Sequence, residues 1–164
     1  MQTPVTFRPA IPADVPQILA FIRLLAEYEK LSDEVTATED LLHEWLFEKN
    51  KAEVIFAEAE NEIVGFALFF HNFSTFLGRG GLYLEDLYIK EAHRGKGYGK
   101  AVLQELARLA VARGCGRLEW SCLDWNRPSI DFYLSLNARP MADWTTYRLT
   151  GDALLNMAQG QTST

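Results

Sequence analysis

A glycine-rich turn between an apolar strand and an apolar helix most constrains how this 164-residue chain folds. The segment GGLYLEDLYI (80–89) has strand character, and the turn RGKGYG follows it at 94–99. Apolar residues then recur at helical spacing up to Gly114, which is a typical residue just after a helix end. The strand-like run RLEWSCLD begins at Arg117. Because a helix joins the two strands, we expect them to be parallel, with a right-handed crossover.

The remaining elements predict a mixed α/β sheet. Residues 5–9 read as a first strand and 13–30 as an amphipathic helix, and Thr36-x-x-Glu39 is a capping-box pattern that opens a second helix. The runs AEVIFAEAE and EIVGFALFF predict a hairpin that turns at Glu60–Asn61. Further along lie a helix capped by Asn126, a last strand ADWTTYRLT and a short helix DALLNMA. We predict one α/β domain over residues 1–164, its sheet mostly antiparallel around a central parallel βαβ unit.

Composition narrows the class of partner. The net charge of −6 disfavours nucleic acid, because phosphate binding requires a basic surface. The apolar runs are shorter than the ~20 residues of a membrane span, and the first residues lack a secretion signal, so we expect no membrane partner. Two cysteines favour a cytoplasmic protein without disulfides. No metal is expected, because the histidines lack ligand spacing, and His93 is expected on a loop surface.

The glycine turn has the features of an anion site. Glycines at 95, 97 and 99 permit positive φ and close approach of backbone N–H groups, and the following helix adds its positive N-terminal end. Arg94, Lys96 and Lys100 add charge, so a diphosphate is the expected guest. The Walker pattern is absent, and a dinucleotide fingerprint fits poorly because it follows the first strand of its fold. Simple turn chemistry is the alternative.

Two adjacent carboxylates interrupt the strand before this turn. Strict alternation leaves neither face of the strand apolar around Glu85 and Asp86, and a β-bulge there would turn both toward a cleft. Alternatively, one of the two is a solvated residue on an exposed face of the sheet. Tyr133 lies on the helix after DWNRPS. A tyrosine on the apolar face of a helix is more often a core residue than a catalytic one. An anion site next to carboxylates indicates a place where an anionic ligand meets a proton acceptor.

These motifs together resemble one enzyme family. RGKGYG is similar to the Arg/Gln-x-x-Gly-x-Gly/Ala acyl-CoA motif of the GNAT superfamily of N-acetyltransferases. The segments LAEYEKL, LYLEDLYI, HRGKGYGKAVL, DWNRPSIDFY and LLNMA more closely resemble its diamine acetyltransferase group, the spermidine/spermine and thialysine N-acetyltransferases. The resemblance covers nearly the whole chain and implies the GNAT fold, with acetyl-CoA lying between splayed parallel strands.

The resemblance also implies a role for each site residue. Acetyl-CoA would lie against the backbone of Leu87, Tyr88 and Ile89 and of Arg94, Gly95, Lys96, Gly97, Tyr98, Gly99 and Lys100, bordered by Asn126 and Ser129. The amine attacks the thioester directly, without a covalent enzyme intermediate. Glu85 is the expected base, through a water, and Tyr133 the expected acid that protonates the leaving thiolate. Residues that would line the amine site are Glu27, Tyr28, Glu29, Glu85 and Asp86.

The sequence does not decide which amine accepts the acetyl group. The segment before the expected last strand carries a single acidic residue, Asp143, so the pocket is less anionic than in polyamine-acetylating relatives. A short diamine or a lysine-like amino acid fits as well as a long polyamine. The alternatives are a protein or peptide acceptor and a non-catalytic acyl-CoA-binding sensor, although mere binding requires neither Glu85 nor Tyr133. Relatives of this group form homodimers, so a homodimer is expected by resemblance.

Overall fold

The computed structural model describes residues 4–161. The chain divides into two compact units, one reaching to Leu123 and the other starting at Asp124. The single domain expected from the sequence remains a prediction. Within residues 4–161, no helix combines the length and apolarity needed to cross a bilayer.

The first unit contains a five-stranded sheet in the order β1-β2-β3-β4-β5. Strands β1 (Thr6–Pro9), β2 (Glu53–Ala59), β3 (Glu62–Ser74) and β4 (Arg79–Ile89) pair antiparallel, and β5 (Leu118–Trp120) pairs parallel to β4. Helix α3 (Tyr98–Ala112) connects β4 to β5. The predicted parallel βαβ unit and the mixed sheet are therefore confirmed, and β5 is one of the two edge strands of this sheet.

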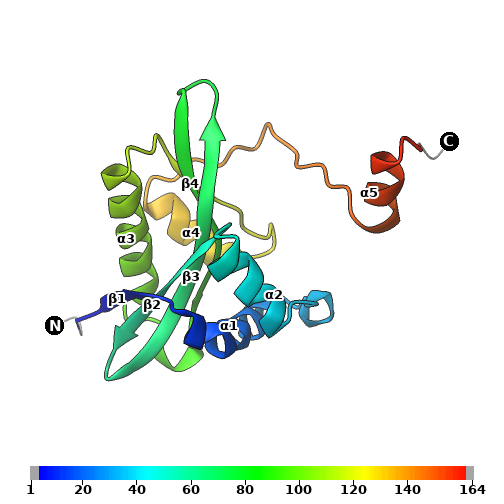
Figure 1. Ribbon diagram of the computed structural model, residues 1–164. Helices are drawn as coiled ribbons and strands as arrows, with labels where there is room; N and C mark the ends of the chain where they lie inside the picture. Colours follow the sequence, from blue (N-terminus) through cyan, green and yellow to red (C-terminus); the bar gives the residue numbers. More distant parts are fainter. Residues whose placement is uncertain (1–3, 162–164) are drawn as a thin grey trace. The chain divides into compact units, whose positions relative to one another are not determined.

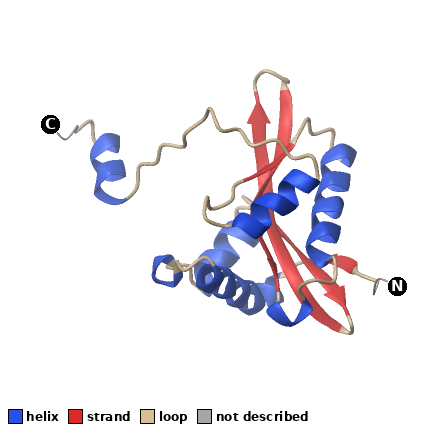
Figure 2. Ribbon diagram, turned by 180° about the vertical axis from the view of Figure 1, so that it is seen from behind, coloured by secondary structure: helices blue, strands red, loops and turns tan. Residues whose placement is uncertain are grey.

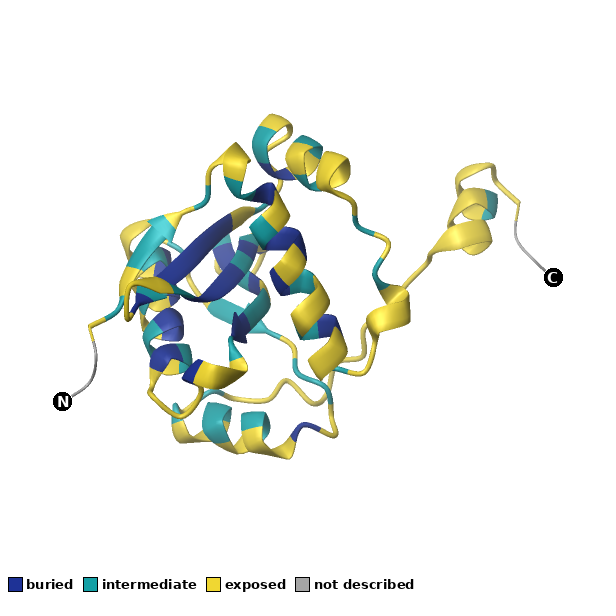
Figure 3. Cartoon of the chain, turned by 90° about the horizontal axis from the view of Figure 1, so that it is seen from below, coloured by how far each residue is buried: buried dark blue, intermediate teal, exposed yellow. Residues whose placement is uncertain are grey.

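Helices α1 (Val15–Tyr28) and α3 cover opposite faces of the sheet, as Figures 1 and 2 show. On one face, Phe21 of α1 stacks on Phe66 of β3 with ring centroids 4.9 Å apart. On the other face, the Arg113 guanidinium after α3 lies 5.8 Å from the centre of the Phe69 ring. Because strand side chains alternate between faces, β3 buries residues on both sides. Figure 3 shows buried residues along the strands and on one side of the flanking helices.

The core on the α1 face is rich in phenylalanine. Its buried members come from α1, the region after α2 (Glu39–His43), and three strands: Ile18, Phe21, Leu46, Val54, Phe56, Phe66 and Tyr88. Full burial of such a side chain contributes about 1.5–3 kcal/mol relative to exposure. This packing fixes β4 and the C-terminal end of α1 against each other, which matters for the site.

Short helical segments join these elements. A 3-10 turn at Pro12–Asp14 precedes α1, another lies at Ser32–Glu34, and a π-helical turn at Glu44–Glu48 continues α2. The predicted capping box at Thr36 is wrong, because the Thr38 hydroxyl accepts the Leu41 N–H at 3.2 Å and caps α2 instead. The hairpin at Glu60–Asn61 is confirmed, and both residues have positive φ.

The second unit contains α4 (Arg127–Ser135) and α5 (Gly151–Ala158), joined by an extended segment. The predicted strand ADWTTYRLT does not form: residues 144–150 carry no strand assignment, and Trp144 and Tyr147 are 78% and 92% exposed. Alternation and β-branched residues favour a strand, but a strand also requires a partner for its backbone hydrogen bonds. The predicted terminal helix is confirmed as α5.

Candidate active site

Glu85 is the extra residue of a β-bulge in β4. The register between β3 and β4 runs through Phe66–Tyr88 and Leu68–Asp86, then shifts so that Phe69 is opposite Leu84. Glu85 has no partner in this register, which confirms the bulge predicted from the sequence. The bulge shifts the alternation of the strand, and Asp86 comes to lie on the same face as Tyr88 and α1.

Three carboxylates gather beside the bulge and form what we call the carboxylate cluster: Glu29, Glu85 and Asp86. Glu85 is exposed, whereas Asp86 and Glu29 are half-buried, Glu29 directly after α1. Burial raises the pKa of Asp86 to about 7, and the charges of Glu85 and Glu29 act in the same direction. Burial and the charge of Glu85 also raise the pKa of Glu29. A cationic ligand would relieve this mutual repulsion.

Beyond the bulge, one edge of β4 has no partner strand among the described residues. Strand β5 pairs only with Leu82–Leu84 of β4, so residues 86–89 have no partner from β5. The Lys90 N–H donates to the Val64 carbonyl of β3 at 2.8 Å. Since successive N–H groups of a strand alternate in direction, those of Leu87 and Ile89 point to the side away from β3. We call residues 86–89 on that side the uncovered edge; its N–H groups can pair with an extended ligand.

The glycine turn at residues 94–99 follows the uncovered edge after a short 3-10 turn at Glu91–His93. Gly95 and Gly97 have φ of 80° and 85°, a conformation that costs other residues about 1–2 kcal/mol. Helix α3 begins at Tyr98, with Gly97 as its N-cap residue. Backbone N–H groups and the N-terminal end of a 15-residue helix therefore meet at this turn. An anionic group is the chemistry that this backbone favours.

The charged side chains of the turn contact protein groups. The Arg94 Nε donates to the Ile89 carbonyl at 3.0 Å, and its guanidinium lies 4.9 Å and 5.0 Å from the ring centres of Tyr28 and Tyr88. Lys96 Nζ lies 3.1 Å from both carboxylate oxygens of Glu60. Lys100 is exposed on the first turn of α3. The turn is thus held in shape by two of the three cations predicted to bind phosphate.

Comparison with known proteins identifies the family. The family model described as acetyltransferase (GNAT) matches residues 18–137. The chain is 37% identical to thialysine N-epsilon-acetyltransferase of Sus scrofa, over 94% of this chain and 97% of that protein. This chain belongs to the GNAT family.

Two further proteins extend this comparison. The L-ornithine N5-acetyltransferase of Arabidopsis thaliana is 32% identical, over 90% of this chain and 85% of that protein. The crystal structure of an integron cassette protein from the mobile metagenome of V. cholerae superposes with a TM-score of 0.78. It is 27% identical and covers 94% of this chain and 98% of its own. The resemblance to the diamine acetyltransferase group is therefore confirmed, and acetyl-CoA is the co-substrate of the family.

The predicted GNAT residues on α1 lie at its C-terminal end. Tyr28 contacts Arg94 of the glycine turn, and Glu29 belongs to the carboxylate cluster. The packing of α1 on the sheet thus connects this helix end with both parts of the candidate site. Glu27 is exposed at the same helix end, and its contact with substrate stays a prediction.

The second unit carries the other predicted GNAT residues on α4. The Asn126 side chain accepts the Ser129 N–H at 3.4 Å, so the predicted helix cap is confirmed, and Asn126 is buried. Tyr133 is half-buried, and its ring centre lies 5.7 Å from that of Phe132. Asn137 follows α4 with φ of 65°, a conformation that asparagine tolerates. The roles of Asn126, Ser129 and Tyr133 toward acetyl-CoA stay predictions.

Sequence reasoning missed a histidine next to the glycine turn. His93 was expected on a loop surface, but it is 8% exposed, and each of its ring nitrogens faces a carboxylate: Glu60 at 2.9 Å and Glu62 at 2.6 Å. The prediction was wrong because its partners come from a hairpin about thirty positions earlier, which no local pattern indicates. Among the described residues, no group of His, Cys, Asp and Glu could hold a metal ion.

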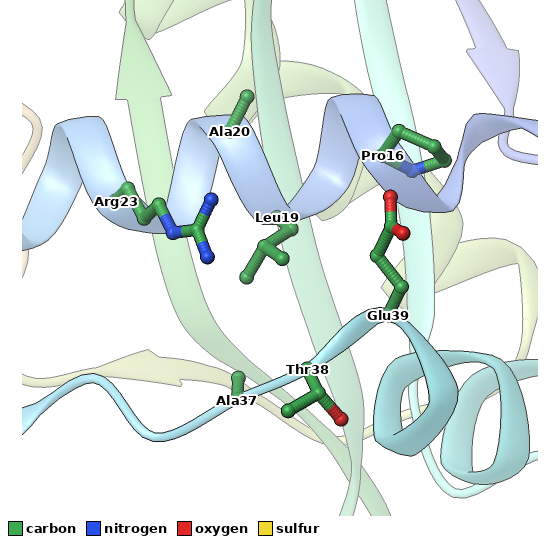
Figure 4. Close-up of a pocket in the computed structure, with 7 residues that line it drawn as sticks. All are labelled: Pro16, Leu19, Ala20, Arg23, Ala37, Thr38 and Glu39. Carbon is green, nitrogen blue, oxygen red and sulfur yellow. The ribbon is translucent and has the colours of Figure 1, made fainter.

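A surface pocket between α1 and the start of α2 lies outside the candidate site. Figure 4 shows Arg23 and Glu39 pointing into it from the two segments, and its other lining residues are Pro16, Leu19, Ala20, Ala37 and Thr38. None of the predicted site residues lines this pocket.

Proposed function

We propose that this protein transfers the acetyl group of acetyl-CoA to a primary amine of a small cationic acceptor, with a lysine- or ornithine-like amino acid as the preferred class. Two GNAT proteins similar to this chain are named for acetyl transfer to a small amine, one to thialysine and one to L-ornithine. An amino acid of this kind has a terminal alkylammonium that a few carboxylates can hold. The three members of the carboxylate cluster match that requirement.

The observation that carries the proposal is the arrangement along β4. The carboxylate cluster lies at one end of the uncovered edge, and the glycine turn lies at the other. We propose that the pyrophosphate binds at the turn and that the extended pantetheine pairs with the uncovered edge. The thioester is thereby delivered to the carboxylates. The Leu87 N–H then polarises the thioester carbonyl, an interaction worth about 3 kcal/mol when well aimed.

The proton steps follow from the same arrangement. An alkylammonium has a pKa near 10.4, so it must lose a proton before its nitrogen can attack the thioester carbonyl. Glu85 receives this proton through a water, while Asp86, whose pKa burial raises to about 7, lies beside it and holds the cationic substrate. Collapse of the tetrahedral intermediate forms the amide and releases the CoA thiolate, which Tyr133 protonates.

The assembly and location of the enzyme are part of the proposal. Resemblance to the group supports a homodimer in the cytoplasm, acting on a small molecule and not on nucleic acid or a membrane surface. Size-exclusion chromatography with light scattering would measure the mass directly. A mass of twice 18.6 kDa is expected, and a monomer at micromolar concentration would contradict the dimer.

A panel of amines tests the function. CoA-thiol release from acetyl-CoA is measured with thialysine, ornithine, lysine, putrescine, spermidine and a peptide amine. We expect turnover with one or more amino acid acceptors and a loss of about 100-fold in Tyr133→Phe. Tyr147→Phe serves as the control, because Tyr147 is 92% exposed and has no assigned role. Turnover of the peptide alone, or binding of acetyl-CoA without turnover, would overturn the proposed acceptor class.

A further inference from the structure

The hairpin between β2 and β3 holds the glycine turn through one carboxylate. Glu60 lies at the tip of this hairpin with φ of 54°. One side chain from before the turn and two from within it converge on Glu60: His93 Nδ1 at 2.9 Å, Lys96 Nζ at 3.1 Å and the Tyr98 hydroxyl at 3.1 Å. These partners lie 33 to 38 positions away in sequence, so the contacts are purely tertiary.

A second carboxylate of the hairpin completes the arrangement. Glu62 faces the other nitrogen of His93 at 2.6 Å and lies 3.8 Å from Lys90 Nζ. His93 and Tyr98 are buried, with 8% and 2% of their surfaces exposed. Packing fixes the His93 ring and the Tyr98 hydroxyl. Because Glu60 contacts both groups, it restrains the backbone on both sides of Gly95 and Gly97. We call this set (Glu60, Glu62, His93, Lys96 and Tyr98) the hairpin clasp.

We propose that Glu60 is a positioning residue for acetyl-CoA, which holds the glycine turn in the conformation whose N–H groups receive the pyrophosphate. The inference rests on the proposed function, since it concerns the co-substrate site of that activity. Glu60 acts through His93, Lys96 and Tyr98 and does not itself touch the pyrophosphate. Its lowered pKa, caused first by Lys96 and then by His93 and Tyr98, keeps it ionised at neutral pH.

Electrostatics alone predicts the opposite effect of Glu60. A carboxylate beside an anion site repels the pyrophosphate and also neutralises Lys96, so both effects weaken the binding of CoA. Removing that charge would therefore tighten binding if Glu60 had no positioning role. If Glu60 holds the turn, its removal weakens the binding of CoA, even though the loss of a negative charge favours the anionic pyrophosphate. The sign of the change separates the two accounts.

The test compares Glu60→Gln with Glu91→Gln by calorimetric titration of CoA. Glu91 is an exposed carboxylate three residues before the turn, and its backbone carbonyl accepts the Arg94 N–H, so it is a matched control for loss of charge. We expect the Kd of CoA to rise about five- to tenfold in Glu60→Gln and to stay equal or fall in Glu91→Gln. In the acetyl-transfer assay, the KM for acetyl-CoA rises in Glu60→Gln, while kcat and the KM for the amine stay unchanged.

A shorter ligand and a second variant complete the test. Pantetheine lacks the pyrophosphate, so its affinity should be the same in Glu60→Gln and the unsubstituted protein. Because Lys96 acts with Glu60, the variant carrying both Glu60→Gln and Lys96→Gln should lose no more affinity than the weaker-binding single variant. Unchanged or tighter CoA binding in Glu60→Gln, an equal loss for pantetheine, or additive losses would overturn the inference.

The two proposals fail in different ways. If the unsubstituted protein does not bind CoA, the proposed function is wrong, and the role of Glu60 falls with it. If the unsubstituted protein binds CoA and acetylates an amine while Glu60→Gln behaves identically, only the positioning role is wrong. Thermal unfolding of each variant confirms that the compared proteins are folded.

Discussion

The two ends of the uncovered edge of β4 differ in how they arrange charge. At the glycine turn, Lys96 and His93 face carboxylates of the hairpin clasp, and Arg94 lies against two tyrosine rings. At the bulge, the carboxylate cluster brings like charges together, and burial adds to their repulsion. The charges at the glycine turn form pairs that fix the backbone conformation. The charges at the bulge repel one another, and a cationic substrate would reduce this repulsion. The end proposed to bind the amine therefore costs stability, whereas the end proposed to bind the pyrophosphate pairs opposite charges.

The largest effect is expected from removing the charge at the bulge. Glu85→Gln combined with Asp86→Asn should lower kcat/KM for the amine by about 10²–10⁴-fold, because it removes both the cation site and the proton acceptor. The Kd of CoA should stay within about twofold, because neither carboxylate belongs to the glycine turn. Steady-state kinetics and a CoA titration measure the two quantities, and a parallel loss of CoA binding would show that the two ends are not separate.

A smaller effect is expected from straining the glycine turn. Gly97→Ala places a side chain at φ of 85° and should weaken CoA binding by about tenfold, because the left-handed conformation costs about 1–2 kcal/mol. Gly78→Ala is the matched control: Gly78 has φ of 67°, open space around its Cβ position, and lies in the loop between β3 and β4. Both variants should lose similar stability in thermal unfolding. Equal CoA affinities in the two variants would refute the anion site.

Stability should depend on pH through Asp86. Its pKa is higher in the folded protein than the ordinary value of 3.8, so the folded state binds this proton more tightly than the unfolded chain. Protonation therefore stabilises the fold, and the contribution grows as the pH falls from about 8 to about 4. Asp86→Asn should raise the free energy of unfolding at pH 8 by about 1–2 kcal/mol, less than the full shift because the side chain is half-buried.

Denaturant unfolding at several pH values checks this prediction. The difference between Asp86→Asn and the unsubstituted protein should shrink toward pH 4, where Asp86 is protonated in the folded state. A difference that grows as the pH falls would mean that Asp86 is stabilised as a carboxylate, contrary to the repulsion described here.

Sequence patterns predicted the parts of the site that lie close together along the chain. The conflict between alternation and polarity around Glu85 indicated the bulge, and the glycines of the turn indicated positive φ, which Gly95 and Gly97 adopt. Both signals are local, because backbone conformation depends mainly on neighbouring residues. The parallel pairing of β4 with β5 was predictable for a similar reason, since a helix of this length dictates the crossover.

Long-range contacts were not predictable in this way. The environment of His93 depends on Glu60 and Glu62, and a single sequence does not indicate which hairpin packs against the turn. The pKa of Asp86 depends on the packing of the end of α1 against β4. The segment at 144–150 has a strand pattern but no strand assignment, since a strand also depends on a neighbour for its backbone hydrogen bonds, which the pattern does not specify.

The pH dependence of the KM for the amine tests the central claim most directly. Between pH 6 and 8 the acceptor remains cationic, because its pKa is near 10.4, whereas Asp86 titrates at about 7. The KM for the amine should fall as the pH rises through 7, the KM for acetyl-CoA should stay constant, and Asp86→Asn should abolish the change. A KM for the amine that is flat over this range, or that still changes in Asp86→Asn, would contradict the account of the carboxylate cluster.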